Sequence, residues 1–217
     1  MKIQSNHTEF IPFKSRNKII RYADDIVRRV NVCYPRISSS KVDDFTNIHA
    51  FRKYHKELSD RVSMFREDIK DSFNEAVNLV GEAKAFVNPV KRHKLGNCGE
   101  SAQLANILAK VNGIKNCYIA SLRTSTLRSL DHSVVYVEGK TPYIIDAWLG
   151  FADYVPNAIL RYKNEYRKHF FILDDNKLIF QKLDNKYTHS LNQNFTQIQI
   201  DELKKIFPEQ VIKKGQM

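Results

Sequence analysis

The sequence predicts an α+β fold in which a helical N-terminal part precedes a helix packed on an antiparallel β-sheet. Apolar residues recur at the three-and-four spacing of amphipathic helices through most of residues 17–87. Short β-prone runs separated by turn residues follow from residue 117 onward. We therefore expect a mostly helical part over residues 1–90 and a second part over residues 91–217. The length of 217 residues suits one compact domain that contains both.

The N-terminal part is divided by its turn signals. Residues 1–16 show no clear period, and we expect an extended arm there. Residues 17–32 predict the first helix, which Tyr34-Pro35 closes before a loop at the SSSK segment. Residues 46–87 predict two further helices without showing where the break falls. Asn88-Pro89 is expected to end this part, and the segment KRHKLG (91–96) to form a basic loop.

The second part opens with a helix at residues 98–111, for which Asn112-Gly113 supplies the stop signal. One stripe of this helix carries small residues and can approach a sheet closely: Cys98, Ala102, Ala105 and Ala109. Strands are expected at residues 117–122, 132–137 and 143–147, the last two joined by a hairpin turn at 138–141. A helix at 156–167, a hairpin of 170–172 with 178–181, and a short helix at 201–207 complete the chain.

Composition narrows the class of protein. The chain carries 35 Lys and Arg against 24 Asp and Glu, a net charge of +11, which favours acidic partner surfaces. Nucleic acid is not the expected partner, because the basic residues are spread along the chain and no recognition motif accompanies them. No stretch approaches the roughly 18 apolar residues of a membrane span, and the N-terminus lacks a secretory signal. We expect no transmembrane segment and a cytoplasmic location in the producing cell.

Three residues stand where a cysteine nucleophile enzyme needs them: Cys98 at a helix start, His132 at a strand start and Asp146 near the end of the next strand. A helix N-terminus favours the reactive thiolate through its backbone N–H groups and its dipole. Gly96 and Gly99 leave room for a substrate backbone, and the Cys98 N–H is a candidate donor to an oxyanion. The three cysteines form no CxxC pair, so neither a disulfide framework nor a Cys-rich zinc site is expected.

The hairpin register tests this triad, because directly paired residues share a sheet face. With a loop of residues 138–140, His132 lies opposite Asp146, and with a loop of 139–141 the two are diagonal neighbours. A two-residue turn at Gly139-Lys140 would instead place them on opposite faces. Asp131 and Asp153 are the rival acids for orienting the imidazole.

The segments NCGE (97–100), DHSVV (131–135) and IDAW (145–148) together resemble the papain-like and transglutaminase-like cysteine enzymes, particularly compact forms among bacterial effectors. In that superfamily a cysteine on a helix faces a His and an Asp or Asn on adjacent strands. The resemblance implies that residues 91–217 form a catalytic core with the triad Cys98, His132 and Asp146. No counterpart is evident for the upstream glutamine that completes the oxyanion hole of papain-type enzymes.

The implied activity is that of a protease, glutamine deamidase or transglutaminase on a protein or peptide, without metal or organic cofactor. An effector of this type is translocated into a host cell and acts on a host protein. Because papain-type enzymes use asparagine as the third residue, Asp146→Asn is expected to keep more activity than Asp146→Ala. Asn97, Gly99 and Trp148 are the candidate oxyanion or substrate-binding residues, and Trp148 can also shield the His-Asp pair from water.

Other interpretations of these residues remain open. Glu100 can simply favour the helix N-terminus, and Cys33 and Cys117 are assigned to packing. A metal site from His93, Cys98 and His132 lacks close ligand spacing and is not expected. The alternative function is a noncatalytic basic module that docks to an acidic protein or anionic membrane through its helices and its C-terminal lysines: Lys204, Lys205, Lys213 and Lys214.

Overall fold

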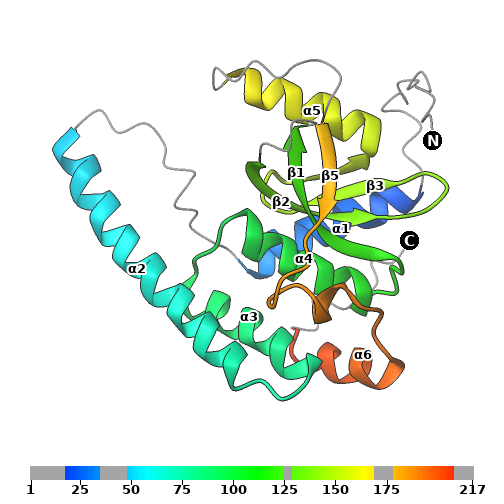
Figure 1. Ribbon diagram of the computed structural model, residues 1–217, viewed down its shortest axis with the longest axis horizontal. Helices are drawn as coiled ribbons and strands as arrows, with labels where there is room; N and C mark the ends of the chain where they lie inside the picture. Colours follow the sequence, from blue (N-terminus) through cyan, green and yellow to red (C-terminus); the bar gives the residue numbers. More distant parts are fainter. Residues whose placement is uncertain (1–17, 35–47, 125–128, 169–177, 208–217) are drawn as a thin grey trace.

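The computed structural model describes residues 18–34, 48–124, 129–168 and 178–207. These residues form six α-helices and a five-stranded antiparallel sheet (Figure 1), which agrees with the expected α+β class. The expected N-terminal arm, the SSSK loop, the strand at 170–172 and Lys213 and Lys214 lie outside the described residues.

The elements follow one another in an order close to the expected one. The helices are α1 (Lys18–Cys33), α2 (Ile48–Asn74), α3 (Leu79–His93), α4 (Cys98–Val111), α5 (Val155–Lys168) and α6 (Gln197–Lys204), with a 3-10 turn η2 (Ser190–Asn192). The strands are β1 (Cys117–Thr124), β2 (Ser129–Val137), β3 (Tyr143–Asp146), β4 (Phe151–Tyr154) and β5 (Leu178–Lys182).

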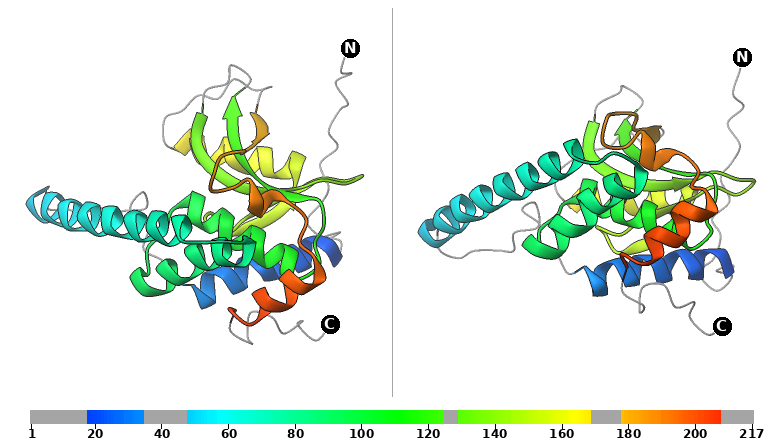
Figure 2. Two further views of the ribbon diagram at one scale, coloured as in Figure 1. Left: turned by 60° about the horizontal axis from the view of Figure 1, so that its bottom comes forward. Right: turned by 90° about the horizontal axis from the view of Figure 1, so that it is seen from below.

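The sheet has the order β4-β3-β2-β1-β5 and separates two layers of helix. Helices α1 and α4 pack against one face, and α5 packs against the other beside β3 and β4 (Figures 1 and 2). Helices α2 and α3 form an antiparallel pair at the side of α4, and α6 contacts both α3 and α4. Helices α1 and α3 of the first half thus pack directly against the helix that carries Cys98.

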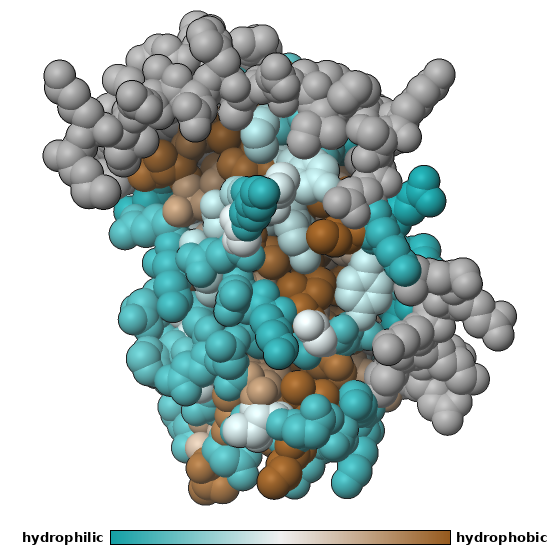
Figure 3. All heavy atoms as spheres, turned by 90° about the vertical axis from the view of Figure 1, so that its right-hand side faces the viewer, coloured by the Kyte–Doolittle hydropathy of each residue, from teal (hydrophilic) through white to brown (hydrophobic). Residues whose placement is uncertain are grey.

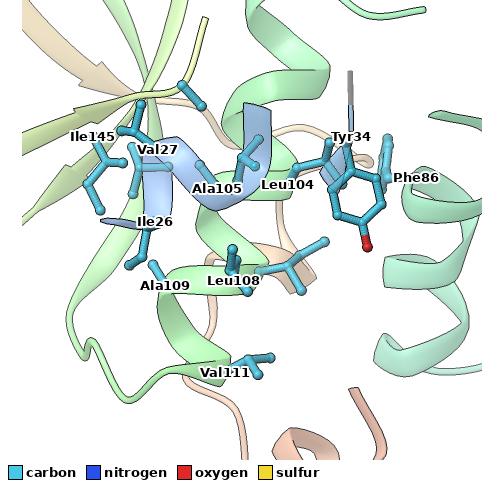
Figure 4. Close-up of a cluster of buried hydrophobic side chains, with 14 of the residues drawn as sticks. Ile26, Val27, Tyr34, Phe86, Leu104, Ala105, Leu108, Ala109, Val111 and Ile145 are labelled. Carbon is cyan, nitrogen blue, oxygen red and sulfur yellow. The ribbon is translucent and has the colours of Figure 1, made fainter. Parts of the chain in front are cut away.

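The main hydrophobic core lies between the sheet and the helices α1, α3 and α4. Figure 4 shows Ile26 and Val27 of α1 beside Ala105 and Leu108 of α4 and Ile145 of β3. All five side chains are at most 4% exposed. The alanines on α4 allow α1 and the sheet to come close, as the stripe of small residues in the sequence indicates.

A second core fills the opposite face of the sheet. Val134 of β2 and Ile144 of β3 pack there with Ala158 and Tyr162 of α5, and each of these side chains is 0% exposed. Because side chains alternate along a strand, the even-numbered residues of β2 and β3 face α5. This parity decides where His132 and Asp146 lie.

The structure places one helix boundary that the sequence left open and corrects another. The break between α2 and α3 falls at residues 75–78, where the Asn78 side chain accepts a hydrogen bond from Gly81 N at 2.9 Å and caps α3. Helix α3 then continues through Pro89 to His93, so the expected stop at Asn88-Pro89 is wrong, and only residues 94–96 of the expected basic loop at 91–96 lie outside the helix.

The continuation past Pro89 has a physical reason. An internal proline costs a helix about 3 kcal/mol, but Pro89 is buried in the core side of α3. Arg92 and His93 in the last turn both bind Asp68 of α2, at 2.7 and 2.8 Å. The positive charge of Arg92 also suits the C-terminal end of the helix dipole. Tertiary contacts therefore outweigh the local stop signal.

The C-terminal segment differs from the expectation as well. Helix α6 begins at Gln197 rather than at Asp201, because Thr196 and Gln199 form a capping box. The turn η2 before it is fastened to α4 and β1. Asn192 accepts a hydrogen bond from Ile119 N at 2.7 Å, and the buried ammonium of Lys110 donates to the carbonyl oxygens of Leu191 and Gln193. Burial lowers the pKa of Lys110 to about 8.

Strand β4 does not appear among the expected elements. It forms an edge of the sheet, and its Ala152 N donates to the Asp24 carboxylate of α1 at 2.9 Å. Helix α1 therefore covers an edge that would otherwise present an unsatisfied amide.

On the face shown in Figure 3, hydrophilic side chains frame a band of apolar ones. The most exposed large apolar residues among those described, Val77, Ile198 and Val32, belong to separate parts of the fold. None of the described helices combines the length and the apolar character that crossing a membrane requires.

Candidate active site

The start of α4 places Cys98 at the N-terminal end of a capped helix. Asn97 is the N-cap residue, and its backbone N–H donates to Glu100 Oε2 at 2.8 Å. Ser101 Oγ donates to the Asn97 carbonyl oxygen at 2.7 Å. Glu100 thus stabilises the start of the helix, which is the role that the sequence analysis gave it. Cys98 is the first helical residue and its side chain is partly exposed.

The hairpin between β2 and β3 puts His132 and Asp146 on one face. Val135 pairs with Ile145 and Val137 with Tyr143, a register that places Asp146 across from Val134, two residues from His132. This register equals the diagonal arrangement expected for a loop of residues 139–141. The two side chains meet directly, with His132 Nε2 donating to Asp146 Oδ2 at 2.6 Å.

The carboxylate of Asp146 accepts four hydrogen bonds. Its Oδ1 accepts hydrogen bonds from Trp148 N at 3.1 Å and Leu149 N at 2.8 Å. Its Oδ2 accepts from His132 and from the Tyr162 hydroxyl, the latter at 2.8 Å. The residue is 1% exposed. These donors replace the water that burial removes, so a buried carboxylate is tolerated here.

His132 connects this carboxylate to Cys98. Burial alone would lower the pKa of His132, but the charge and hydrogen bond of Asp146, together with a hydrogen bond to Cys98, raise it from 6.5 to about 9. Since Nε2 is bonded to Asp146, the ring nitrogen left for the thiol is Nδ1. The imidazole therefore has a partner on each side, and both partners favour its protonated form.

Two aromatic side chains enclose the imidazole. The ring centroid of His132 lies 5.3 Å from that of Trp148 and 5.5 Å from that of Tyr162. Trp148, a predicted site residue, is partly exposed, whereas Tyr162 is fully buried. The two rings keep water from the His-Asp pair.

Tyr162 is the site residue that sequence reasoning misses. It lies on α5, and the sequence predicts that helix correctly but gives no sign that this tyrosine reaches Asp146 across 16 residues of chain. The only signal available is its position on the apolar side of the helix pattern, which equally suits a plain core residue.

The rival acid Asp153 has different partners. Its carboxylate accepts hydrogen bonds from Tyr154 N, Asn157 Nδ2 and Arg161 Nε, at 3.0, 3.0 and 3.1 Å. These bonds tie it to the first two turns of α5. The side chain of Asp131 lies outside the described residues.

The remaining predicted residues occupy distinct environments. A Cβ built on Gly99 would meet no atom within 4 Å, so this position faces open space beside Cys98.

Cys117 is buried with its Sγ near Ile114 O, at 3.6 Å, and Cys33 packs against the main core. His93 binds Asp68 rather than Cys98. Within the described residues, no group of three or more potential ligands could hold a metal ion.

Comparisons with known proteins identify no relative. No protein-family model matches the sequence, and neither curated proteins nor solved structures give a match. The interpretation of the site therefore rests on its own geometry.

Proposed function

We propose that the protein is a cysteine nucleophile enzyme that acts on amide groups of a protein or peptide substrate, with the papain-like or transglutaminase-like triad Cys98, His132 and Asp146. The observation that carries this proposal is the buried His132-Asp146 pair with its bond to Cys98 at a helix start. Burying such a pair is expensive, and a docking module has no need of it.

The reaction follows from the positions of the three side chains. In the reactive form of the pair Cys98 is a thiolate and His132 an imidazolium, and the sulfur attacks the amide carbonyl carbon, whose π electrons move to oxygen. The first-turn N–H groups of α4 point toward its N-terminal end, so the Cys98 N–H is the donor assigned to the oxyanion. As the tetrahedral intermediate collapses, the C–N bond breaks and His132 gives its proton to the leaving amine.

The thioester then reacts with an acceptor. Neutral His132 takes a proton from water or from an amine, which attacks the thioester carbon and releases the Cys98 thiolate. Water yields a cleaved peptide or a deamidated side chain, and an amine yields a cross-link. Asp146 holds the imidazole in the required tautomer throughout. No step requires a metal or an organic cofactor.

Thiol reactivity tests this proposal without knowledge of the substrate. Cys98 is expected to react with iodoacetamide faster than Cys33 and Cys117, because the His132 imidazolium stabilises its thiolate. Burial raises the pKa of Cys117 to about 11 and also raises that of Cys33, so these two thiols serve as internal controls. Site-resolved mass spectrometry of the folded protein between pH 5 and 9 gives the three rates. A Cys98 that reacts no faster than the controls would remove the nucleophile.

The reaction type is identified by a lysate experiment. Wild-type protein and Cys98→Ala are incubated with the same cell lysate, and mass spectrometry scores new peptide termini, deamidated glutamines and glutamine-amine cross-links together. One of these products is expected with wild type alone. Products that form equally with folded Cys98→Ala would refute the proposed nucleophile.

The noncatalytic docking alternative receives less support. Of the lysines that would carry it, Lys204 binds Asp201 at 2.9 Å, and the outermost two lie outside the described residues. It would be favoured by an unreactive Cys98 in the alkylation experiment.

A further inference from the structure

Tyr162 is placed by packing that leaves its hydroxyl little freedom. Its side chain is 0% exposed, and its ring lies 5.5 Å from that of Phe151 and 6.2 Å from that of Phe180, measured between centroids. Helix α5, which carries it, is anchored to Asp153 by Asn157, five residues before Tyr162, and by the adjacent Arg161. The hydroxyl is thus presented to Asp146 by a rigid helix.

The Tyr162 hydroxyl shares one carboxylate oxygen with the imidazole. Asp146 Oδ1 is already fixed by the two backbone N–H groups of Trp148 and Leu149, so Tyr162 is not needed to orient the carboxylate. Oδ2 instead accepts from both the Tyr162 hydroxyl, at 2.8 Å, and His132 Nε2, at 2.6 Å. Two donors to one oxygen compete for the same negative charge.

This competition lowers the affinity of His132 for its proton. The bond from Tyr162 is strongest when Asp146 carries its full negative charge, that is, when His132 is neutral. It is weaker when the imidazolium already neutralises that charge. Tyr162 therefore stabilises the neutral imidazole more than the imidazolium, and it opposes the rise in proton affinity that Asp146 produces.

We propose that Tyr162 is a positioning residue of the site, which acts through Asp146 and limits how tightly His132 holds its proton. The proposal deepens the proposed function, since an imidazole that gives up its proton more readily is a better acid toward the leaving amine. Among the described residues, the titratable groups that face His132 come from three elements: Cys98 of α4, Asp146 of β3 and Tyr162 of α5.

The test is Tyr162→Phe, which removes the hydroxyl and keeps the ring. The His132 ring is titrated by NMR in full-length wild type and variant. Its pKa, already near 9, is expected to rise further by about half a unit or more. Tyr143→Phe is the matched control, because Tyr143 is also buried but faces the opposite core. That control is expected to leave the His132 pKa unchanged.

A second variant reverses the perturbation. Tyr162 replaced by a fluorinated tyrosine has a more acidic phenol, which donates a stronger hydrogen bond, so the His132 pKa is expected to fall. Opposite shifts in the two variants could not come from a general loosening of the fold. Equal His132 pKa values in wild type, Tyr162→Phe and the fluorinated variant would overturn the proposal.

Kinetics supply an independent readout once a substrate is known. Because Tyr162→Phe keeps the ring beside His132 and removes the hydroxyl that binds Asp146, KM is expected to stay unchanged while kcat near neutral pH falls roughly three- to tenfold. The alkaline limb of the pH profile should move upward with the His132 pKa. The NMR result needs no activity, so a failure of the proposed function, seen as full activity in Cys98→Ala, is distinguishable from a failure of this inference.

Discussion

Replacing Asp146 by asparagine tests the electrostatics of the site most directly. The two backbone N–H groups at Oδ1 require an acceptor, so the asparagine oxygen must take that position. Its amide nitrogen then faces Tyr162 and His132 Nε2, where the structure needs an acceptor. The neutral ring must accept at Nε2 and carry its proton on Nδ1, the nitrogen that serves the thiol. This is the wrong tautomer for a base.

The size of the effect follows from the pKa of His132. The rise from 6.5 to about 9 corresponds to about 3 kcal/mol, at 1.36 kcal/mol per unit. Without the carboxylate, burial, which is the largest influence and lowers the pKa, is opposed only by the interaction with Cys98, so the pKa of His132 should fall well below 9. The imidazolium fraction near neutral pH would then drop as well. The structure thus changes the expectation from the sequence: Asp146→Asn should lose activity as severely as Asp146→Ala.

The assay is an NMR titration of the His132 ring, combined with Cys98 alkylation rates near neutral pH. Asp153→Asn is the matched control, since it removes another buried carboxylate that binds α5 rather than His132. Circular dichroism verifies that both variants are folded. A His132 pKa that stays near 9 in Asp146→Asn would refute the assignment of Asp146 as its partner.

Two further predictions concern stability. The folded-state pKa of His132 is raised, so its contribution is fully present below pH 6.5 and is lost as pH rises through about 9. Between pH 6.5 and 9, wild type should therefore lose up to about 3 kcal/mol of unfolding free energy relative to Asp146→Asn. Urea denaturation at several pH values measures this difference. Plots of unfolding free energy against pH that run parallel for the two proteins would contradict the prediction. Asn192→Ala should lower the unfolding free energy by about 1–3 kcal/mol, because Ile119 N loses its acceptor. The exposed Asn194→Ala is its control, and equal denaturation midpoints would show that the Ile119 bond contributes nothing.

The sequence predicts most of the secondary structure because its hydrophobic periods are strong. Helix α4 begins and ends at the expected residues, Cys98 and Val111, where a capping residue and an Asn-Gly stop coincide with the apolar pattern. The missed strand β4 is four residues long, too short to show a period, and it is stabilised by Asp24 from α1. Pro89 led to the prediction of a helix end that does not form, because this local stop signal is weaker than the packing of α3.

The sequence by itself determined which residues could do chemistry: a cysteine at a helix start, and a histidine and an aspartate on neighbouring strands. It also restricted their geometry to a few registers, since strand parity is a local property. Only the tertiary structure decided which register forms, that Asp153 is committed to α5, and that Tyr162 shares the carboxylate of Asp146. These outcomes depend on contacts between segments far apart in the chain, and their energies are set by burial and by the sharing of donors, which no local pattern encodes.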